Sequence, residues 1–316
     1  MKNRRAFCQK SIIAVAGIVS YGVIGCRSKK EKPVPEIKNS LKLSLAQWSL
    51  HKAFFAKELD PINFAPVTAS YDIKAVEYVN QFYVEHVNNE PFWMEMQQRA
   101  SGEGVNSLLI MVDDEGDLGD PDSQKRKEAA INHQKWINAA KLMDCHSIRV
   151  NAFGSGTKSE MHGYLVDGLS QLCEYASKEN INVLIENHGL YSSDAQWVTN
   201  VIKAVDSPFL GTLPDFGNWC TNEKWGSTKD DACTDSYDLY NGVKEFMPYA
   251  KGVSAKSYDF NEDGTVKGID YNKMIDLVKA EGYDGYVGIE YEGENLSEPD
   301  GIRATKALLE DAWNRS

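Results

Sequence analysis

The amino-acid sequence predicts an α/β fold in which eight parallel strands form a barrel with helices outside it. Three observations support this prediction. Short apolar runs of strand length alternate with longer stretches of helical periodicity from Leu43 onward, which is the pattern of a parallel sheet. Eight such runs can be placed, and eight parallel strands close into a barrel. Several runs end on polar residues, as expected where strands converge on one pocket.

The predicted strands are short and rich in aliphatic and β-branched residues, which favour extended backbone. In chain order they cover Leu43–Trp48, Ala75–Val79, Asn106–Val112, Ser147–Asn151, Asn182–Glu186, Leu210–Asp215, Gly252–Ser257 and Tyr286–Glu290. The segments between them repeat apolar residues at spacings of three and four, as at Trp136, Ala139, Ala140 and Met143. Asp270 is suited to cap the helical stretch that follows it. Residues 41–316 are therefore predicted to form one (β/α)8 TIM barrel.

The first 25 residues are expected to be a signal peptide that is removed on export. Basic residues precede an apolar stretch, Ile12–Ile24, which is too short to span a bilayer, and Arg4 and Arg5 resemble a twin-arginine signal. Val23–Cys26 resembles a lipobox, so we expect lipid attachment at Cys26 and a tether over residues 26–40. These features predict an exported lipoprotein at the periplasmic face of a membrane, held there by this anchor only.

Charge and cysteine content restrict the partners. The net charge of −12 argues against a nucleic-acid partner, because an acidic body repels polyphosphate. An exported chain can keep disulfides. Cys145 and Cys173 fit buried apolar positions, whereas Cys220 and Cys233 flank a polar loop and either stay free or form a bridge. The sequence leaves the oligomeric state open.

Three carboxylates end predicted strands five, six and eight, each after an apolar run: Glu186, Asp215 and Glu290. In a barrel they would meet at one mouth and repel one another. A divalent cation is the simplest remedy. Mn²⁺ fits the oxygen-rich set best, with Mg²⁺ as an alternative and Co²⁺ or Zn²⁺ as further ones if His188 also binds the metal. In the opposing interpretation, each carboxylate caps a helix or pairs with a basic side chain.

Further polar and aromatic residues end the strands and are candidates for substrate binding: Trp48, Glu77, Asn151, His188 and Trp219. The aromatic side chains, together with Phe82 and Tyr83, could stack on a sugar or simply pack between barrel and helices. Lys256 could stabilise negative charge, act as a base if burial lowers its pKa, or replace the metal by pairing with the carboxylates. The acidic run 113–117 is interpreted as a solvated loop. Residues 259–264 are interpreted as a tight turn rather than a calcium loop, because a strand precedes them.

These strand-end motifs resemble the xylose-isomerase-like barrel superfamily of sugar phosphate isomerases and epimerases, from about Leu43 to Trp313. The most specific stretches are residues 45–49, 75–80, 147–151, 185–189, 213–218, 254–260 and 285–293. The resemblance implies that Glu186, Asp215 and Glu290 bind the metal and that the two glutamates transfer protons. The sequence departs from the family at Ser254, where a His or Gln ligand is usual, so three protein groups could be left to hold the metal.

Together these features predict a metal-dependent isomerase or epimerase of a sugar or polyol that transfers a proton through an enediolate, with Glu186, Glu290 and Lys256 as catalytic residues. One alternative is a lyase or dehydratase acting on an oxidised sugar or glycoside, in which proton abstraction expels a β-leaving group. The other is a non-catalytic carbohydrate-binding lipoprotein, which the missing ligand at Ser254 would allow. In each case the partner is a small carbohydrate or polyol.

Overall fold

The computed structural model describes residues 40–229 and 231–315, which belong to one compact unit. The predicted signal peptide, the lipid attachment site at Cys26 and the tether up to residue 39 lie outside these residues. Within the part of the chain that the structure describes, no helix is both long and apolar enough to cross a membrane.

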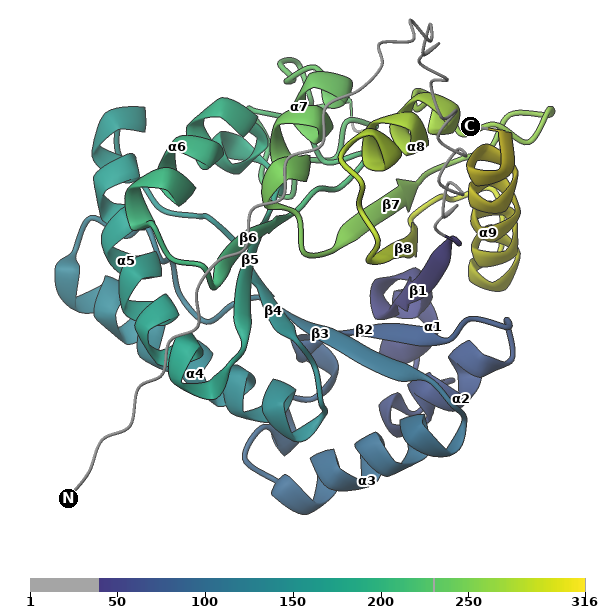
Figure 1. Ribbon diagram of the computed structural model, residues 1–316, viewed down its shortest axis with the longest axis horizontal. Coiled ribbons are helices and arrows are strands. Elements are labelled where there is room, and N and C mark those ends of the chain that lie inside the picture. Colours follow the sequence, from purple (N-terminus) through teal and green to yellow (C-terminus); the bar gives the residue numbers. More distant parts are fainter. Residues whose placement is uncertain (1–39, 230, 316) are drawn as a thin grey trace, which may run out of the picture. The chain divides into compact units, whose positions relative to one another are not determined.

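Eight parallel strands form one curled sheet (Figure 1). They are β1 (Lys42–Ala46), β2 (Ala75–Val79), β3 (Asn106–Val112), β4 (Ser147–Val150), β5 (Asn182–Glu186), β6 (Leu210–Leu213), β7 (Val253–Ser257) and β8 (Tyr286–Tyr291). Their order is β6-β5-β4-β3-β2-β1-β8-β7. The predicted barrel of eight parallel strands is confirmed, and β2, β3 and β5 have the predicted bounds.

The two edge strands of this sheet, β6 and β7, are joined by isolated bridges rather than by a continuous ladder. Thr212 pairs with Ala250 and Asp215 pairs with Ser254, both in parallel orientation. Strand β6 was predicted to continue to Asp215 but ends at Leu213, because Pro214 has no N–H group to donate to a ladder. The Pro214 carbonyl still accepts a hydrogen bond of 2.9 Å from Ser254 N. Asp215 and Ser254, which help to close the barrel, therefore also belong to the polar residues at its carboxyl end.

Helices lie outside the sheet (Figure 1). They are α1 (His51–Phe55), α2 (Phe64–Ala69), α3 (Glu90–Gly102), α4 (Ser123–Leu142), α5 (Lys158–Glu179), α6 (Ala195–Val205), α7 (Leu239–Phe246), α8 (Tyr271–Ala280) and α9 (Glu298–Arg315). Short 3-10 segments cover Gln47–Leu50, Pro61–Asn63, Asn80–Phe82, Val84–His86, Leu190–Ser193 and Met247–Tyr249. The first of these ends β1 at Ala46, two residues before the predicted end. Asp270 caps α8 as predicted, since its carboxylate accepts from Lys273 N at 3.2 Å.

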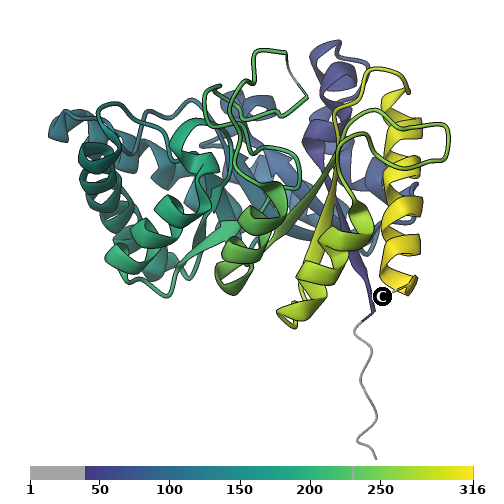
Figure 2. The same cartoon turned by 90° about the horizontal axis from the view of Figure 1, so that it is seen from above.

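Alternation along the strands divides the core in two. The outward side chains join one large apolar cluster with the helices. A smaller cluster fills the barrel interior and consists of Ala46, Val79, Leu109, Met111, Leu184 and Leu213. Polar side chains follow it toward the carboxyl ends of the strands. The loops that leave these ends gather on the upper side of the barrel in Figure 2.

The structure confirms the turn predicted at residues 259–264 and decides between the two alternatives left open for Cys220 and Cys233. Residues 259–264 belong to a tight turn in which Phe260 and Val266 pair in antiparallel orientation. Cys220 and Cys233 form a disulfide in the loop between β6 and α7, while Cys145 and Cys173 are buried and free.

Candidate functional site

The alternation of the strands brings acidic side chains from three strands to one place. On β5, Val183 and Ile185 face the outer core, so Glu186 points inward. Glu290 on β8 and Asp215 after β6 point the same way, and all three side chains are buried. One carboxylate oxygen from each lies within 4.8 Å of the others. The predicted meeting of these three carboxylates at the barrel mouth is observed.

Burial makes this cluster electrostatically costly. It raises the pKa of Asp215 to about 7 and holds the pKa of Glu186 well above its ordinary range. The charge of Lys256 limits the pKa shift of Asp215 most, followed by hydrogen bonds donated by Ser254 Oγ at 2.5 Å and Gly217 N at 2.8 Å. Asn218 N also donates to Asp215 at 2.8 Å. Without a cation, the cluster retains protons at pH values where isolated carboxyl groups have lost them.

Two basic side chains reach the cluster, and each also has a partner outside it. Arg149 Nη1 lies 2.7 Å from Asp113 Oδ1, while its Nε lies 2.9 Å from Glu186 Oε2. Lys256 Nζ lies 3.2 Å from Glu290 and 3.1 Å from Glu292. The effect of these two cations is clearest in the pKa values of their partners outside the cluster, Asp113 and Glu292. Although burial works in the opposite direction, Arg149 lowers the pKa of Asp113 to about 2, and Lys256 lowers that of Glu292 to about 2.

The site is therefore acidic even when its cations are counted. Arg149 and Lys256 face five carboxyl groups, which are Asp113, Glu186, Asp215, Glu290 and Glu292. Lys229 adds a third cation near Glu292. The three cations can balance only three of the five charges once all five groups are ionised. The Arg149–Glu186 pair is also incomplete: the N–H of Nε is not aligned with Oε2, so both buried atoms lack a hydrogen bond despite their short separation.

Ser254 occupies the strand-seven position where the resembling family places a ligand. Its hydroxyl lies 2.5 Å from Asp215 Oδ2 and 2.9 Å from Glu290 Oε2. One hydroxyl proton can be donated to only one of these oxygens at a time. Ser254 therefore positions two of the carboxylates side by side and does not neutralise them.

His188 belongs to a chain of polar contacts that runs along one wall of the site. Its Nδ1 lies 2.7 Å from Asn151 Oδ1, and Asn151 Nδ2 donates to Asp113 at 2.6 Å. Burial and the nearby Arg149 lower the pKa of His188 to about 3. His188 is thus neutral, with Nδ1 donating to Asn151 and Nε2 left as an acceptor.

A cavity of about 370 Å³ opens beside these residues. Its lining includes Trp48, His188, Lys256 and Glu290, which were predicted as site residues, and also residues that were not predicted, among them Asp113, Arg149, Trp225, Lys229 and Glu292. The Trp48 indole N–H donates to Glu292, which also accepts from Lys256. Strands one, seven and eight are thus linked at the cavity wall.

Several predicted contact residues lie away from the cavity. Trp219 is fully buried and packs on Tyr237 and Phe246, so the structure places it in the core instead of in contact with a ligand. Tyr83 is fully buried and accepts from Gln47. Phe82 packs against Phe54 and Phe55. These aromatic side chains serve the packing role that was the alternative to sugar stacking.

Glu77 and Asn151 support the site from behind it. Glu77 is buried on β2 and accepts from Ser44 at 2.6 Å, and burial raises its pKa to about 7. Asn151 orients His188 and Asp113, as described above. Neither residue is among those that line the 370 Å³ cavity. Glu186 and Asp215 also lie behind this lining, whereas Glu290 reaches the cavity itself.

Three important residues were missed by sequence reasoning. Asp113 was assigned to a solvated loop, but it is buried and ion-paired to Arg149. Arg149 shares the inward parity of Asn151, and Glu292 shares that of Glu290, so alternation could have marked both. Asp113 directly follows β3, the same position that identified the other carboxylates.

The side chains fit a divalent cation. Three oxygens converge from three strands, a buried oxygen of Glu186 lacks a hydrogen bond, and the local charge is negative. Their separation is close to the span of a Mg²⁺ ligand shell, roughly 4 Å across. Glu186, Asp215 and Glu290 are therefore the residues that would hold a metal.

Comparison with known protein families decides the relationship. A family model described as xylose isomerase-like TIM barrel matches residues 66–312. The chain belongs to the xylose isomerase-like TIM barrel family. A mouse protein provisionally named hydroxypyruvate isomerase is 24% identical over 167 residues, covering 48% of this chain and 56% of that protein. The chain thus matches little more than half the length of this curated relative.

Several solved structures share the fold of this chain at low sequence identity. An Escherichia coli 3-keto-D-glucoside 4-epimerase aligns with a TM-score of 0.66 at 14% identity, over 86% of this chain and all of that one. The IolI protein with a bound zinc atom aligns at 0.62 and 12% identity, over 87% and 99%. A Bacillus anthracis protein provisionally identified as a 3-DHS dehydratase aligns at 0.60 and 16% identity, over 85% and 98%. These alignments show that the barrel fold is shared.

Proposed function

We propose that this protein is a metal-dependent isomerase or epimerase of a sugar or polyol. The observation that carries the proposal is the convergence of Glu186, Asp215 and Glu290 with no full complement of positive charge around them. Similarity to the 3-keto-D-glucoside 4-epimerase and to the zinc-containing IolI protein supports both the reaction class and the metal. Mn²⁺ suits the all-oxygen ligand set best.

In this proposal the three carboxylates and His188 each have a role. A divalent cation at the three carboxylates would polarise neighbouring carbonyl and hydroxyl oxygens of the substrate and so make the carbon-bound proton more acidic. Glu186 and Glu290 stand on β5 and β8, where one can remove that proton and the other can return it through an enediolate. His188 is neutral and offers Nε2 to a substrate hydroxyl.

Lys256 acts as a cation in this proposal. Although burial works in the opposite direction, Glu290 and Glu292 hold the pKa of Lys256 well above its ordinary value. A base would need a lowered pKa, so of the roles predicted for Lys256, stabilisation of negative charge on the substrate fits best. Its pairing with Glu292 also leaves it unable to neutralise the whole carboxylate cluster in place of a metal.

A lyase or dehydratase is the second candidate, favoured by the similarity to the Bacillus anthracis dehydratase. The same proton abstraction would give elimination if the substrate carried a leaving group β to the acidic carbon. A non-catalytic sugar-binding protein is the third candidate, and the retention of two glutamates beside a charged lysine weighs against it.

The deciding experiment combines metal analysis with hydrogen exchange. We expect about one equivalent of Mn, Co, Zn or Mg in the purified protein. We also expect deuterium from D2O to enter a carbon-bound position of D-psicose, D-fructose or a 3-keto-D-glucoside. The variants Glu186→Gln and Glu290→Gln should slow exchange by roughly 10²–10⁴-fold, and Asp215→Asn should lower the metal content. Glu103→Gln, at an exposed position after α3, is the matched control.

Each outcome favours one candidate. Release of the aglycone would identify a lyase. If neither the wild type nor any variant exchanged deuterium and Glu186→Gln still bound sugar, the chain would be a non-catalytic sugar-binding protein. A metal-free protein that still exchanges at the wild-type rate would contradict metal dependence.

A further inference from the structure

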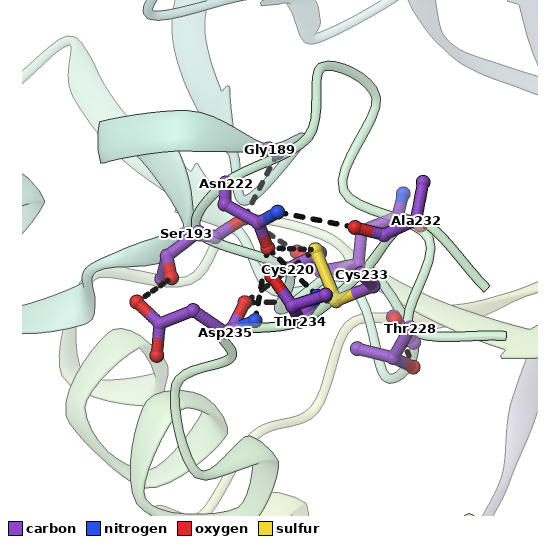
Figure 3. Close-up of a disulfide and its surroundings, with 12 residues drawn as sticks. Gly189, Ser193, Cys220, Asn222, Thr228, Ala232, Cys233, Thr234 and Asp235 are labelled. Carbon is purple, nitrogen blue, oxygen red and sulfur yellow. Dashed lines mark hydrogen bonds between the residues drawn. A yellow bond between two sulfur atoms is a disulfide. The ribbon is translucent and has the colours of Figure 1, made fainter. Parts of the chain in front are cut away.

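The loop between β6 and α7 is braced at its base. The Cys220–Cys233 disulfide joins its two arms (Figure 3). Asn222 lies beside the disulfide, donates to Ala232 O at 3.1 Å and accepts from Asp235 N at 2.9 Å (Figure 3). These contacts fix the direction in which the middle of the loop leaves the barrel.

A second brace connects this loop to the one that follows β5. Gly189 and Lys224 form an antiparallel bridge, and Leu190 N donates to Glu223 O at 3.2 Å. The backbones approach so closely that a Cβ at Gly189 would lie 2.3 Å from Glu223 O, and one at Gly226 would lie 2.5 Å from Gly189 N. Both glycines have a positive φ, so a side chain at either position would force the loops apart.

Trp225 lies between these braces in a conformation that large side chains rarely adopt. Its φ is 73°, in the left-handed region. Its side chain is 40% exposed, although it lines the cavity beside the carboxylates. The indole ring meets His188 edge-on at 5.1 Å and Phe153 at 5.6 Å, with Lys224 Nζ 4.7 Å from its centre. Strain combined with an exposed apolar ring at a binding cavity points to a ligand contact.

Trp48 brings a second indole to the same cavity. It extends from the end of β1 and stacks on His51 at 4.8 Å. Strand β1 is three positions from β6 around the ring of strands, counted through β8 and β7. The cavity therefore has aromatic surface on two parts of its wall. A pyranose offers a broader C–H face to such surface than an open chain of three carbons does.

We propose that Trp225 is a specificity-determining residue, whose indole stacks on the C–H face of a sugar in ring form and selects such a ring over short open-chain substrates. The proposal rests on the proposed function for the identity of the site and adds the class of substrate that it takes. An aromatic face offers an apolar platform to the C–H face of a pyranose, while the polar wall with His188 and Lys256 faces the hydroxyl groups.

Saturation-transfer NMR tests this without turnover. The probes are methyl β-D-glucopyranoside and methyl β-D-galactopyranoside as rings, and glycerol as the open-chain comparison. Wild-type protein should transfer saturation from aromatic protons to the ring C–H protons of at least one pyranoside. Trp225→Ala should weaken pyranoside binding about tenfold, which corresponds to about 1.4 kcal/mol, and Trp225→Phe should retain part of it.

The controls separate stacking from misfolding and from loss of the proposed chemistry. Met94→Ala removes another exposed apolar side chain, on α3, and should leave pyranoside binding unchanged. Metal content and circular dichroism should be equal in all variants. Undiminished pyranoside binding by Trp225→Ala, absence of pyranoside binding by the wild type, or equally strong binding of glycerol would each overturn the proposal. Binding that depends on Trp225 would uphold it even if no deuterium exchange were detected, which would count only against the proposed reaction.

Discussion

At the scale of single residues, the cost of burying the carboxylate cluster should appear as a pH dependence of stability. Burial raises the pKa of Asp215 to about 7 and that of Glu186 well above its ordinary range. A carboxyl group with a raised folded-state pKa holds a proton that the unfolded chain has already released. The free energy of unfolding of the metal-free protein should therefore fall as pH rises from about 4 to 7, by up to about 1.4 kcal/mol per pH unit for each such group.

The difference in urea-unfolding free energy between the chelator-treated wild type and Asp215→Asn, taken at each pH, measures the contribution of Asp215. Added Mn²⁺ should flatten the decline, because the cation replaces the protons. Glu77→Gln is a useful control: Glu77 also has a pKa of about 7 but lies outside the cluster, so its loss should leave the Mn²⁺ effect intact. A wild-type stability that rises with pH relative to Asp215→Asn would contradict this account.

The residues that could be predicted are those whose role follows from their place on a strand. Glu186 and Glu290 follow apolar runs, and alternation alone directs them inward. The partnership of Asp113 with Arg149 joins residues 36 positions apart across two strands, and its strength depends on burial that a linear pattern does not contain. Trp219 and Trp225 lie in the same loop, and only the path of that loop decides that the first is core and the second lines the cavity.

At the scale of elements, the disulfide-braced loop should affect stability and ligand binding together. Removing the bridge with Cys220→Ser and Cys233→Ser frees a segment with a sequence separation of 13 residues. In the chain-entropy model this lowers the free energy of unfolding by roughly 2–3 kcal/mol. Pyranoside binding should also weaken because Trp225 is no longer held in place, while metal content should not change. Urea unfolding and saturation transfer measure the two effects.

Reductant supplies the internal control for this prediction. It should reproduce both losses in the wild type and have no effect on the double variant. If the double variant matched the wild type in stability and binding, the brace would have no role.

The strands were predicted closely because each is an apolar run bounded by polar residues or glycine. Several ends differ by one residue, and the two largest differences lie where backbone chemistry outweighs hydropathy. Pro214 ends β6 early for lack of an N–H group, and Gln47–Leu50 continues an apolar pattern but turns into a 3-10 helix. The loops after β5 and β6 pack together through glycines that are far apart in the sequence. No pattern within either loop predicts that contact.

At the scale of the whole molecule, the predicted lipid anchor at Cys26 concerns residues outside those that the structure describes. We expect cells supplied with labelled palmitate to label the wild-type chain and not Cys26→Ala, and the mature protein to begin at Cys26. Labelling that persists in Cys26→Ala, or a mature chain that retains residues 1–25, would contradict the prediction.

The bridges between β6 and β7 have a consequence for how the molecule holds together. Seven neighbouring strand pairs are joined by ladders, but this last joint depends on two isolated pairings, one of them between Asp215 and Ser254. An ion bound by Asp215 after β6 and by Glu290 on β8 would hold together the two sides of the β6–β7 contact, where the barrel has the fewest strand pairings. Binding of the ion would then complete the active site and close the barrel at the same time. Loss of the ion would weaken the contact between β6 and β7 and also abolish activity.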